Sequence, residues 1–192
     1  MKDKYESHSL IAFERSLTLG LEPKLNYKKA ITGVLTQNLS NLCQNELVPF
    51  LLQRFGNGYW GQQCLNIAPQ TFMILQHSGI DCELVYGEVS INGTDEFDTD
   101  YDELVKELVN PGNAGFAIHV WIQIGKDFII DPTVAARINK YYSEQFPPHQ
   151  IVLGKSKKLL KDLKLDYKPM LAGAKYVTRT CSIPLEYNHE AV

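Results

Sequence analysis

The stretch GFAIHVWIQIGKDFIIDPTV, residues 115–134, decides the fold of the central region of the chain. It holds two short apolar runs, 116–124 and 128–130, joined by Gly125-Lys126-Asp127. Two apolar runs separated by a short turn that contains glycine predict a β-hairpin.

The hairpin carries one imidazole and one carboxylate. His119 lies in the first run, and Asp131 closes the second, twelve positions later. With a turn centred on Gly125 and Lys126, the cross-strand partner of His119 is expected near Asp131 or Pro132. The two side chains can meet only if they point to the same face of the sheet.

The composition describes an ordinary globular chain of 192 residues, with 44% hydrophobic and 21% charged residues, enough for one domain with a proper core. The net charge of −3 argues against a dedicated nucleic-acid binder, which usually has a basic excess. The sequence contains no run of 18 apolar residues, so no membrane span is expected. The first 16 residues lack the apolar segment of a signal peptide. We therefore expect a cytoplasmic protein, with secretion as an effector by a signal-independent route left open.

The four cysteines, Cys43, Cys64, Cys82 and Cys181, form no CxxC or CxxxH pair. This spacing does not support a zinc site of the usual kind, and a disulfide framework is not expected in a chain of this length without an export signal. Each cysteine is then either a small buried side chain or a reactive thiol.

The order of the predicted elements indicates an α+β fold. Helical periodicity covers residues 6–20 and 28–54, with a break expected near Pro49, and resumes at residue 65 until Ser78-Gly79. A glycine-rich loop, 54–64, leads into this last helix, whose start is expected near residues 66–69 because Pro69 suits only a first turn. The remaining expected elements are a strand at 81–91, a helix at 104–109, the hairpin, a helix at 136–145, an amphipathic surface helix over 155–168 and a strand-like run at 174–187.

Cys64 follows the glycine-rich loop at the expected start of a helix. A helix N-terminus carries about half a positive charge and unpaired N–H groups. Both favour thiolate over thiol, and the N–H groups can bind the oxyanion that forms when sulfur attacks a carbonyl. A cysteine nucleophile needs a base, and the base needs a residue that orients it, which are the chemical types of His119 and Asp131.

The order Cys, His, Asp in these surroundings resembles the transglutaminase-like superfamily, a papain-related group of cysteine enzymes. The resemblance lies in residues 59–134: Gly61-Gln62-Gln63-Cys64, then Gly79-Ile80 leading into a strand, His119-Val120-Trp121, and Asp131-Pro132-Thr133. It implies a papain-like core in which Cys64 is the nucleophile, His119 the general base and acid, and Asp131 the orienting group. Two departures are a turn between His119 and Asp131 that is short for the family and the acidic stretch 92–103, which lengthens the connection to the His strand.

The resemblance divides one domain of 1–192 into a helical N-terminal region, 1–58, a catalytic core, 59–134, and a C-terminal extension, 135–192. Within the core, the amides of Gln62 and Gln63 could donate to an oxyanion, although a polar loop role and the backbone N–H of Cys64 are the better interpretations. The side chains of Trp60 and Trp121 could wall a cleft or pack in the core.

The acidic run, Asp95, Glu96, Asp98, Asp100, Asp102 and Glu103, lacks the Gly and the Glu that a calcium-binding EF-hand loop needs. We expect it to be a solvated loop with a helix N-cap at Asp100 or Asp102.

The expected activity is cysteine-dependent acyl transfer or hydrolysis at an amide bond of a protein or peptide, with no metal and no other cofactor. Hydrolysis, by a protease or a glutamine deamidase, is preferred because the chain shows no obvious second substrate module. The alternatives are an amine-accepting transglutaminase, a binding module that keeps the fold without turnover, and a metal site formed by the same three side chains.

Overall fold

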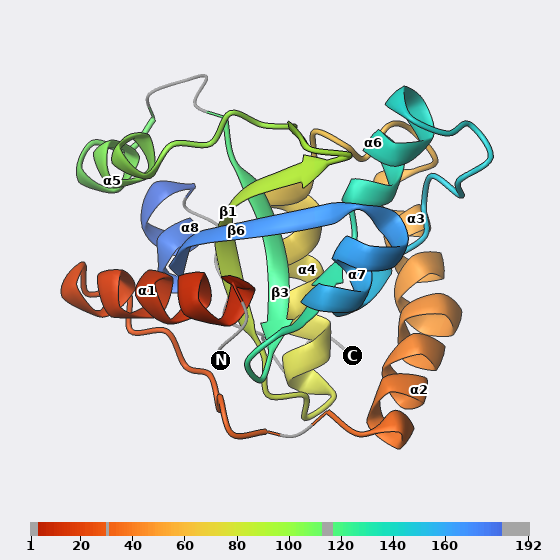
Figure 1. Cartoon of the computed structure of the whole chain (residues 1–192), viewed down its shortest axis with the longest axis horizontal. Helices are drawn as coiled ribbons and strands as arrows, with labels where there is room; N and C mark the ends of the chain where they lie inside the picture. The colour runs from red at the N-terminus through yellow and green to blue at the C-terminus, as the bar shows by residue number, and fades with distance from the viewer. Residues whose placement is uncertain (1–3, 30, 113–116, 182–192) are drawn as a thin grey trace.

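The computed structural model describes residues 4–29, 31–112 and 117–181, and it has an α+β fold built on a curled antiparallel sheet (Figure 1). The helices are α1 Lys4–Thr18, α2 Gly33–Leu42, the π-helical turn Cys43–Leu47, α3 Val48–Phe55, α4 Cys64–His77, α5 Tyr101–Val109, α6 Val134–Tyr141, α7 Ser156–Leu163 and α8 Lys175–Thr180. The strands are β1 Glu83–Ile91, β2 Thr94–Asp95, β3 His119–Ile124, β4 Phe128–Asp131, β5 Val152–Lys155 and β6 Leu165–Ala172.

Strand β1 is the centre of the sheet, and every pairing is antiparallel. It pairs with β3 along one edge and with β6 along the other, and β4 and β5 follow β3 in order. The pairing of β1 with β6 shifts register between Tyr86 and Gly87, and in Figure 1 β6 crosses in front of β3. Such an irregularity increases the local bend of a strand pair, which is how the sheet curls.

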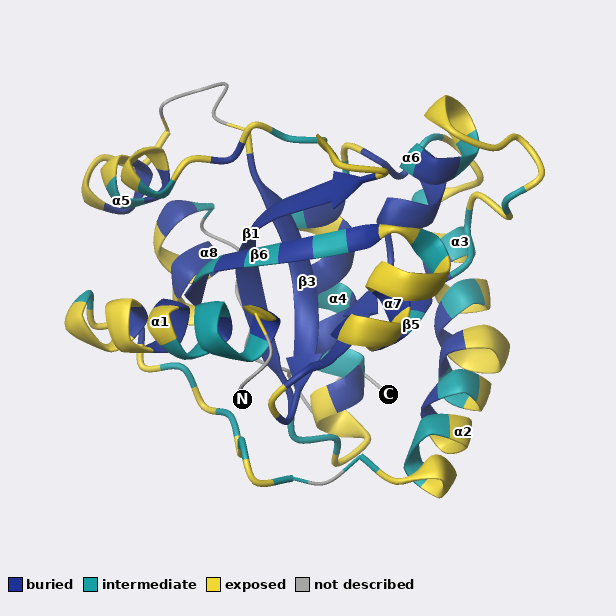
Figure 2. Ribbon diagram, in the orientation of Figure 1, coloured by how far each residue is buried: buried dark blue, intermediate teal, exposed yellow. Residues whose placement is uncertain are grey.

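Each face of the sheet is covered by helices, so β1, β3 and β4 are buried along their whole length (Figure 2). Helix α4 packs on β3 and β1 behind the sheet, whereas α1 packs on β6 in front of it. In β3, Val120, Ile122 and Ile124 belong to the core on the α4 side, and Trp121 belongs to the core on the α1 side. Because side chains alternate along a strand, His119 shares its face with Trp121.

The helices begin where the sequence supplies acceptors for their first N–H groups. Thr32 Oγ1 accepts the N–H of Leu35 at the start of α2. Asp100 caps α5 by accepting the N–H groups of Asp102 and Glu103, which confirms the expected N-cap in the acidic run. Helix α5 starts at Tyr101, before the expected start at residue 104.

Pro49 does not break the second helical segment, which corrects the expectation from its sequence. Residues 33–55 stay helical, and the π-helical turn Cys43–Leu47 comes directly before α3, which contains the proline. The N–H of Val48 bonds to Cys43 O, five residues back. A proline has no N–H to donate and its ring collides with the carbonyl four residues back, so a wider turn accommodates it without ending the helix.

Pro69 gives a second correction. The helix starts at Cys64 rather than between residues 66 and 69, so Pro69 lies inside it and is buried. The helix therefore lacks the hydrogen bond that the N–H of this position would make to the carbonyl of Leu65. Burial of one face of α4 against the sheet compensates for this loss.

The C-terminal third differs most from the expected pattern. Only 156–163 of the segment 155–168 is helical, and the chain turns at Lys164 into β6. Within the run 174–187, residues 175–180 form α8 instead of a strand, and 182–187 lie outside the described residues. The helix expected at 136–145 spans Val134–Tyr141.

Gly87 lets β6 approach β1 closely where the sheet curls. A Cβ atom at this position would lie 2.2 Å from the backbone oxygen of Lys168. We expect Gly87→Ala to destabilise the protein by about 1–3 kcal/mol, the usual cost of overpacking.

The measurement is the urea midpoint of unfolding, with Gly33→Ala as the matched control. Gly33 begins α2, and a Cβ there meets nothing within 4 Å, so its replacement should be neutral or stabilising because alanine favours a helix. Equal midpoints for the two variants would contradict the close approach at Gly87.

Candidate active site

Cys64 is the first residue of α4, and the loop before it is folded tightly. The N–H of Gln63 bonds to Trp60 O, and the N–H groups of Asn66 and Ile67 bond to Gln63 O. The N–H of Cys64 precedes these first bonds of the helix and is one of the groups that a helix N-terminus leaves available. The thiol is almost fully buried, with the residue 4% exposed, and donates to the carbonyl oxygen of Ile118 at 3.3 Å.

Gly61 leaves room for two side chains that pack closely beside this loop. A Cβ at Gly61 would lie 2.3 Å from Tyr59 Oη and 2.8 Å from Arg137 Cγ. The side chains of Tyr59 and Arg137 therefore occupy the space beside the loop, three residues before Cys64.

His119 is the first residue of β3, and the thiol of Cys64 bonds to the carbonyl of the residue before it. The imidazole is fully buried. Its Nε2 donates to Asp131 Oδ2 at 2.6 Å. The sequence prediction that these two side chains meet on one face of a hairpin is confirmed.

The register of the hairpin differs slightly from the expected one. Ile122 lies opposite Ile130, and Ile124 lies opposite Phe128. Continuing this register puts Asp131 opposite Trp121, so Asp131 is the diagonal neighbour of His119 instead of its direct partner. The diagonal distance on one face of a sheet is still short enough for a histidine and an aspartate to bond.

The Asp131 carboxylate accepts hydrogen bonds at both oxygens. Oδ1 accepts from the backbone N–H groups of Thr133 at 2.9 Å and Val134 at 3.0 Å and from Thr133 Oγ1 at 3.3 Å, at the start of α6. Oδ2 accepts from His119 and also from Tyr167 Oη at 3.0 Å. The carboxylate is fully buried, and these donors hold it in one orientation.

Burial and pairing act in opposite directions on the pKa of each partner. Burial lowers the pKa of His119, but the charge and hydrogen bond of Asp131, together with Cys64, outweigh it and raise this pKa to about 10. Burial raises the pKa of Asp131, but His119 and the N–H groups of Thr133 and Val134 bring it below its usual value. The site therefore holds an imidazolium and a carboxylate at neutral pH.

The second imidazole nitrogen is the one available to Cys64. His119 Nδ1 is buried and has no hydrogen-bond partner among the described residues. Nε2 is engaged by Asp131, and the sulfur of Cys64 lies near enough to the imidazole to contribute to its raised pKa. A small rotation of the thiol away from the carbonyl of Ile118 would complete a chain from sulfur through imidazole to carboxylate.

The other residues singled out in the sequence have separate positions. Gln62 is exposed, and the amide of Gln63 donates to Tyr59 O at 3.4 Å. Trp60 is fully buried, donates to Gly56 O and packs against the ring of His149, so it belongs to the core instead of a cleft wall.

Trp121 is also fully buried, yet its ring stacks on the imidazole of His119 at a centroid distance of 5.9 Å. Its indole N–H donates to Tyr5 Oη, which in turn donates to the amide oxygen of Gln123. Trp121 thus combines core packing with support of the imidazole.

Sequence reasoning missed three residues that contact or surround the pair. Tyr167 bonds to Asp131, Phe97 stacks on His119 at 4.5 Å with the rings 15° from parallel, and Arg137 lies over Phe97 at 4.3 Å. The alternation of apolar and charged residues over 165–168, Leu-Asp-Tyr-Lys, is a sequence signal that could have revealed the strand that carries Tyr167. Phe97 and Arg137 carry no such signal, because they reach the site only through the folding of a loop and a helix.

Within the described residues, no three His, Cys, Asp or Glu side chains are arranged to hold a metal ion. Across those same residues, no helix combines the length and the apolar character that a membrane crossing requires.

Comparisons with known proteins do not identify a family. No family model matches the chain, and no curated protein matches it. A crystal structure described only as a structural genomics target is similar over 79% of this chain and 73% of its own, with 13% sequence identity and a TM-score of 0.42. A likeness at this level carries no argument about function, so function has to be argued from the site itself.

The His119–Asp131 pair gives a prediction for stability against pH. Because the pKa of Asp131 is lowered, its contribution is present above the unfolded value of about 3.9 and is lost as the pH falls below it. Because the pKa of His119 is raised to about 10, its contribution is complete below the unfolded value of about 6.5 and is lost as the pH rises towards 10.

We therefore expect the free energy of unfolding in urea to decline between about pH 6.5 and 10 in the wild type. His119→Gln, which does not titrate, should show a flatter profile over this range. Parallel profiles for the two proteins would contradict a buried ion pair.

Proposed function

We propose that this protein is a cysteine enzyme that breaks amide bonds of a protein or peptide through Cys64, His119 and Asp131, and that its core is papain-like, of the transglutaminase-like type. The observation that carries the proposal is the direction of the imidazole. Asp131 accepts a hydrogen bond from Nε2, which leaves Nδ1 for the sulfur of Cys64. Cys64 lies at the N-terminus of α4, where free N–H groups can bind an oxyanion.

The arrangement of the elements supports the papain-like aspect of the proposal. The nucleophile begins a helix that packs on an antiparallel sheet, the histidine begins a strand, and the aspartate ends the next strand along the chain. This is also the order of the three residues in the family that the sequence resembles.

In the proposed first step, the Cys64 thiolate attacks the carbonyl carbon of the amide. The new C–S bond forms as the carbonyl π electrons move to oxygen, and the backbone N–H of Cys64 is the nearest candidate donor to this oxyanion. The oxyanion then re-forms its carbonyl, the C–N bond breaks, and the imidazolium of His119 gives its Nδ1 proton to the departing amine. The products of this step are a thioester on Cys64 and a neutral imidazole.

In the second step, His119 Nδ1 takes a proton from water as the water oxygen attacks the thioester. The acid leaves, and the thiolate and imidazolium return. Asp131 keeps its charge throughout and holds the ring in one orientation. An amine in place of water would give transglutamination by the same steps.

Hydrolysis remains the preferred outcome, because no second substrate module is evident in the sequence. A peptide bond as the substrate makes the protein a protease, and a glutamine side chain makes it a deamidase. The competing proposal is a binding module with the same fold, in which Cys64 never forms a thioester.

Alkylation of the native protein tests the nucleophile. We expect Cys64 to react readily with iodoacetamide at pH 6, because the imidazolium of His119 stabilises the attacking sulfur. His119→Ala should slow the pH 6 reaction by about 10²-fold. The reason is that an ordinary thiol, with a pKa near 8.5, is ionised to less than about one part in a hundred at that pH. Mass mapping of the labelled peptides is the measurement.

Cys43 and Cys82 are internal controls in the same sample. Burial raises the pKa of Cys43 to about 12 and also raises the pKa of Cys82. Both should stay unlabelled at pH 6. Equal rates of Cys64 labelling at pH 6 in the wild type and in His119→Ala would favour the binding module.

The reaction class is tested with casein and with a glutamine-containing peptide as substrates. New N-termini indicate a protease, ammonia release without chain cleavage indicates a deamidase, and incorporation of an added primary amine indicates a transglutaminase. We expect one of the two hydrolytic products and a loss of at least about 10³-fold in Cys64→Ala, the order of effect seen when a nucleophile is removed. Product formation equal in wild type and Cys64→Ala would refute the assignment of the nucleophile.

A further inference from the structure

The proposed site is closed in this structure. The residues Cys64, His119 and Asp131 are 4%, 0% and 0% exposed. A substrate amide has to come within bonding distance of the sulfur and within hydrogen-bond distance of the imidazole. Some of the cover must therefore move before the reaction.

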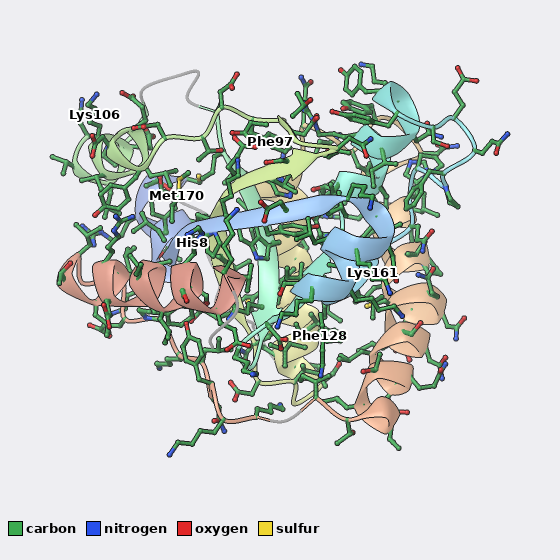
Figure 3. All side chains as sticks on the ribbon, viewed as in Figure 1. His8, Phe97, Lys106, Phe128, Lys161 and Met170 are labelled. Carbon is green, nitrogen blue, oxygen red and sulfur yellow. The ribbon has the colours of Figure 1, made fainter. Side chains whose placement is uncertain are left out.

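Phe97 is the side chain that covers the imidazole of His119, the proposed base. Its ring stacks on the imidazole of His119, at 4.5 Å between centroids and 15° between planes. Figure 3 labels Phe97 in the segment after β2, at the end of the sheet opposite Phe128 in the hairpin.

Arg137 of α6 covers Phe97 in turn. Its guanidinium lies 4.3 Å from the centre of the Phe97 ring, and its Cγ is beside Gly61 in the loop that leads to Cys64. The stack of His119, Phe97 and Arg137 thus extends from the base to the loop of the nucleophile.

An ion pair holds the stack in place. Arg137 Nε donates to Glu96 Oε2 at 2.8 Å, and Arg137 Nη2 donates to the backbone oxygen of Glu96 at 2.7 Å. The two side chains are 14% and 5% exposed, so solvent screens this pair little. Tyr142 Oη, also near the end of α6, donates to the same carboxylate.

The backbone below Phe97 is anchored separately, by Glu88 of β1. This buried carboxylate accepts the N–H groups of Glu96 and Phe97 at Oε1, both at 3.0 Å, and of Thr99 at Oε2, at 2.7 Å. Asp98, with φ of 52°, supplies the turn that lets these N–H groups converge on one side chain. With the backbone fixed at several points, the Phe97 ring and the Arg137 side chain are the parts of this stack that can move.

We propose that Phe97 is a gate over His119, held closed by the Arg137–Glu96 ion pair and hinged on a backbone that Glu88 anchors, and that this gate determines the size of the group that can reach Cys64. The proposal rests on the proposed function in one respect, because it takes Cys64 as the atom that a substrate must reach. It adds two specificity-determining residues, Phe97 and Arg137, that lie outside the three reacting side chains.

The test compares two reagents with the same reactive group and different sizes, iodoacetamide and N-(1-pyrenyl)iodoacetamide. The quantity measured is the rate of the pyrenyl reagent at Cys64 divided by the rate of iodoacetamide at Cys64, both obtained by mass mapping of the full-length protein. We expect Phe97→Ala and Arg137→Met to raise the ratio for the pyrenyl reagent by about tenfold, which corresponds to about 1.4 kcal/mol of barrier removed. Glu96→Gln, which weakens the ion pair and leaves Arg137 in place, should raise it by a smaller factor.

Lys140→Met is the matched control for Arg137→Met. Lys140 is on the same helix and also lies over aromatic rings, but these are the rings of Tyr59 and Tyr141 instead of Phe97. Its ratio should stay within about twofold of the wild type, because a side chain away from the stack changes the barrier by well under 1.4 kcal/mol. The ratio at Cys181, which is outside the site, should stay within the same range.

A ratio at Cys64 that is unchanged in folded Phe97→Ala and in folded Glu96→Gln would overturn the gate. If Phe97→Ala does not fold, the rate ratios of Glu96→Gln and Arg137→Met decide whether the gate proposal holds. Failure of the gate is distinguishable from failure of the proposed function, since the latter is read from the effect of His119→Ala on the iodoacetamide rate alone. If the variants change the ratio of the two rates but His119→Ala does not change the iodoacetamide rate, the gate proposal holds and the enzyme proposal fails.

Discussion

The hydrogen bonds of the Asp131 carboxylate are the constraint on which the arrangement of the site depends. This one group accepts from His119 of β3, from Tyr167 of β6 and from Thr133 and Val134 at the start of α6. A buried carboxylate is costly unless donors surround it, so these elements have to meet around it. The strand order brings β6 close to β4 only because the sheet curls, and Gly87 allows that curl.

The same burial that makes the ion pair strong also closes the site. Low exposure holds the imidazolium and the carboxylate in a fixed arrangement, and it excludes water that would screen their attraction. A reaction at Cys64 requires the site to open transiently, so that a substrate can reach the sulfur. In the proposed mechanism, the backbone stays fixed by Glu88 while side chains move, so access does not require the His119–Asp131 pair to come apart.

The two faces of the sheet contribute different members of the site. Helix α4, which carries Cys64, packs on the face of Val120 and Ile122, whereas His119 and Trp121 point to the face covered by α1. Cys64 and His119, the proposed nucleophile and base, come together because each lies at the end of its element, where the thiol of Cys64 bonds to the carbonyl of Ile118. A histidine two positions later in β3 would share its face but would lie away from the helix N-terminus.

The sequence by itself determined the local elements of this site: a helix that follows the glycine-rich loop of Cys64, and a hairpin that carries His119 in its first run and Asp131 at the end of its second. These follow from short-range periodicity and turn chemistry. Only the tertiary structure decided that Tyr167 completes the shell of Asp131, that Phe97 and Arg137 cover the imidazole, and that residues 165–172 form a strand where a helix was expected up to residue 168. The physical reason is that the side-chain contacts join positions 22 to 41 residues apart in the sequence, and β6 pairs with β1 across 74 to 87 residues. Burial of shared apolar surface, which no local pattern encodes, brings such distant positions together.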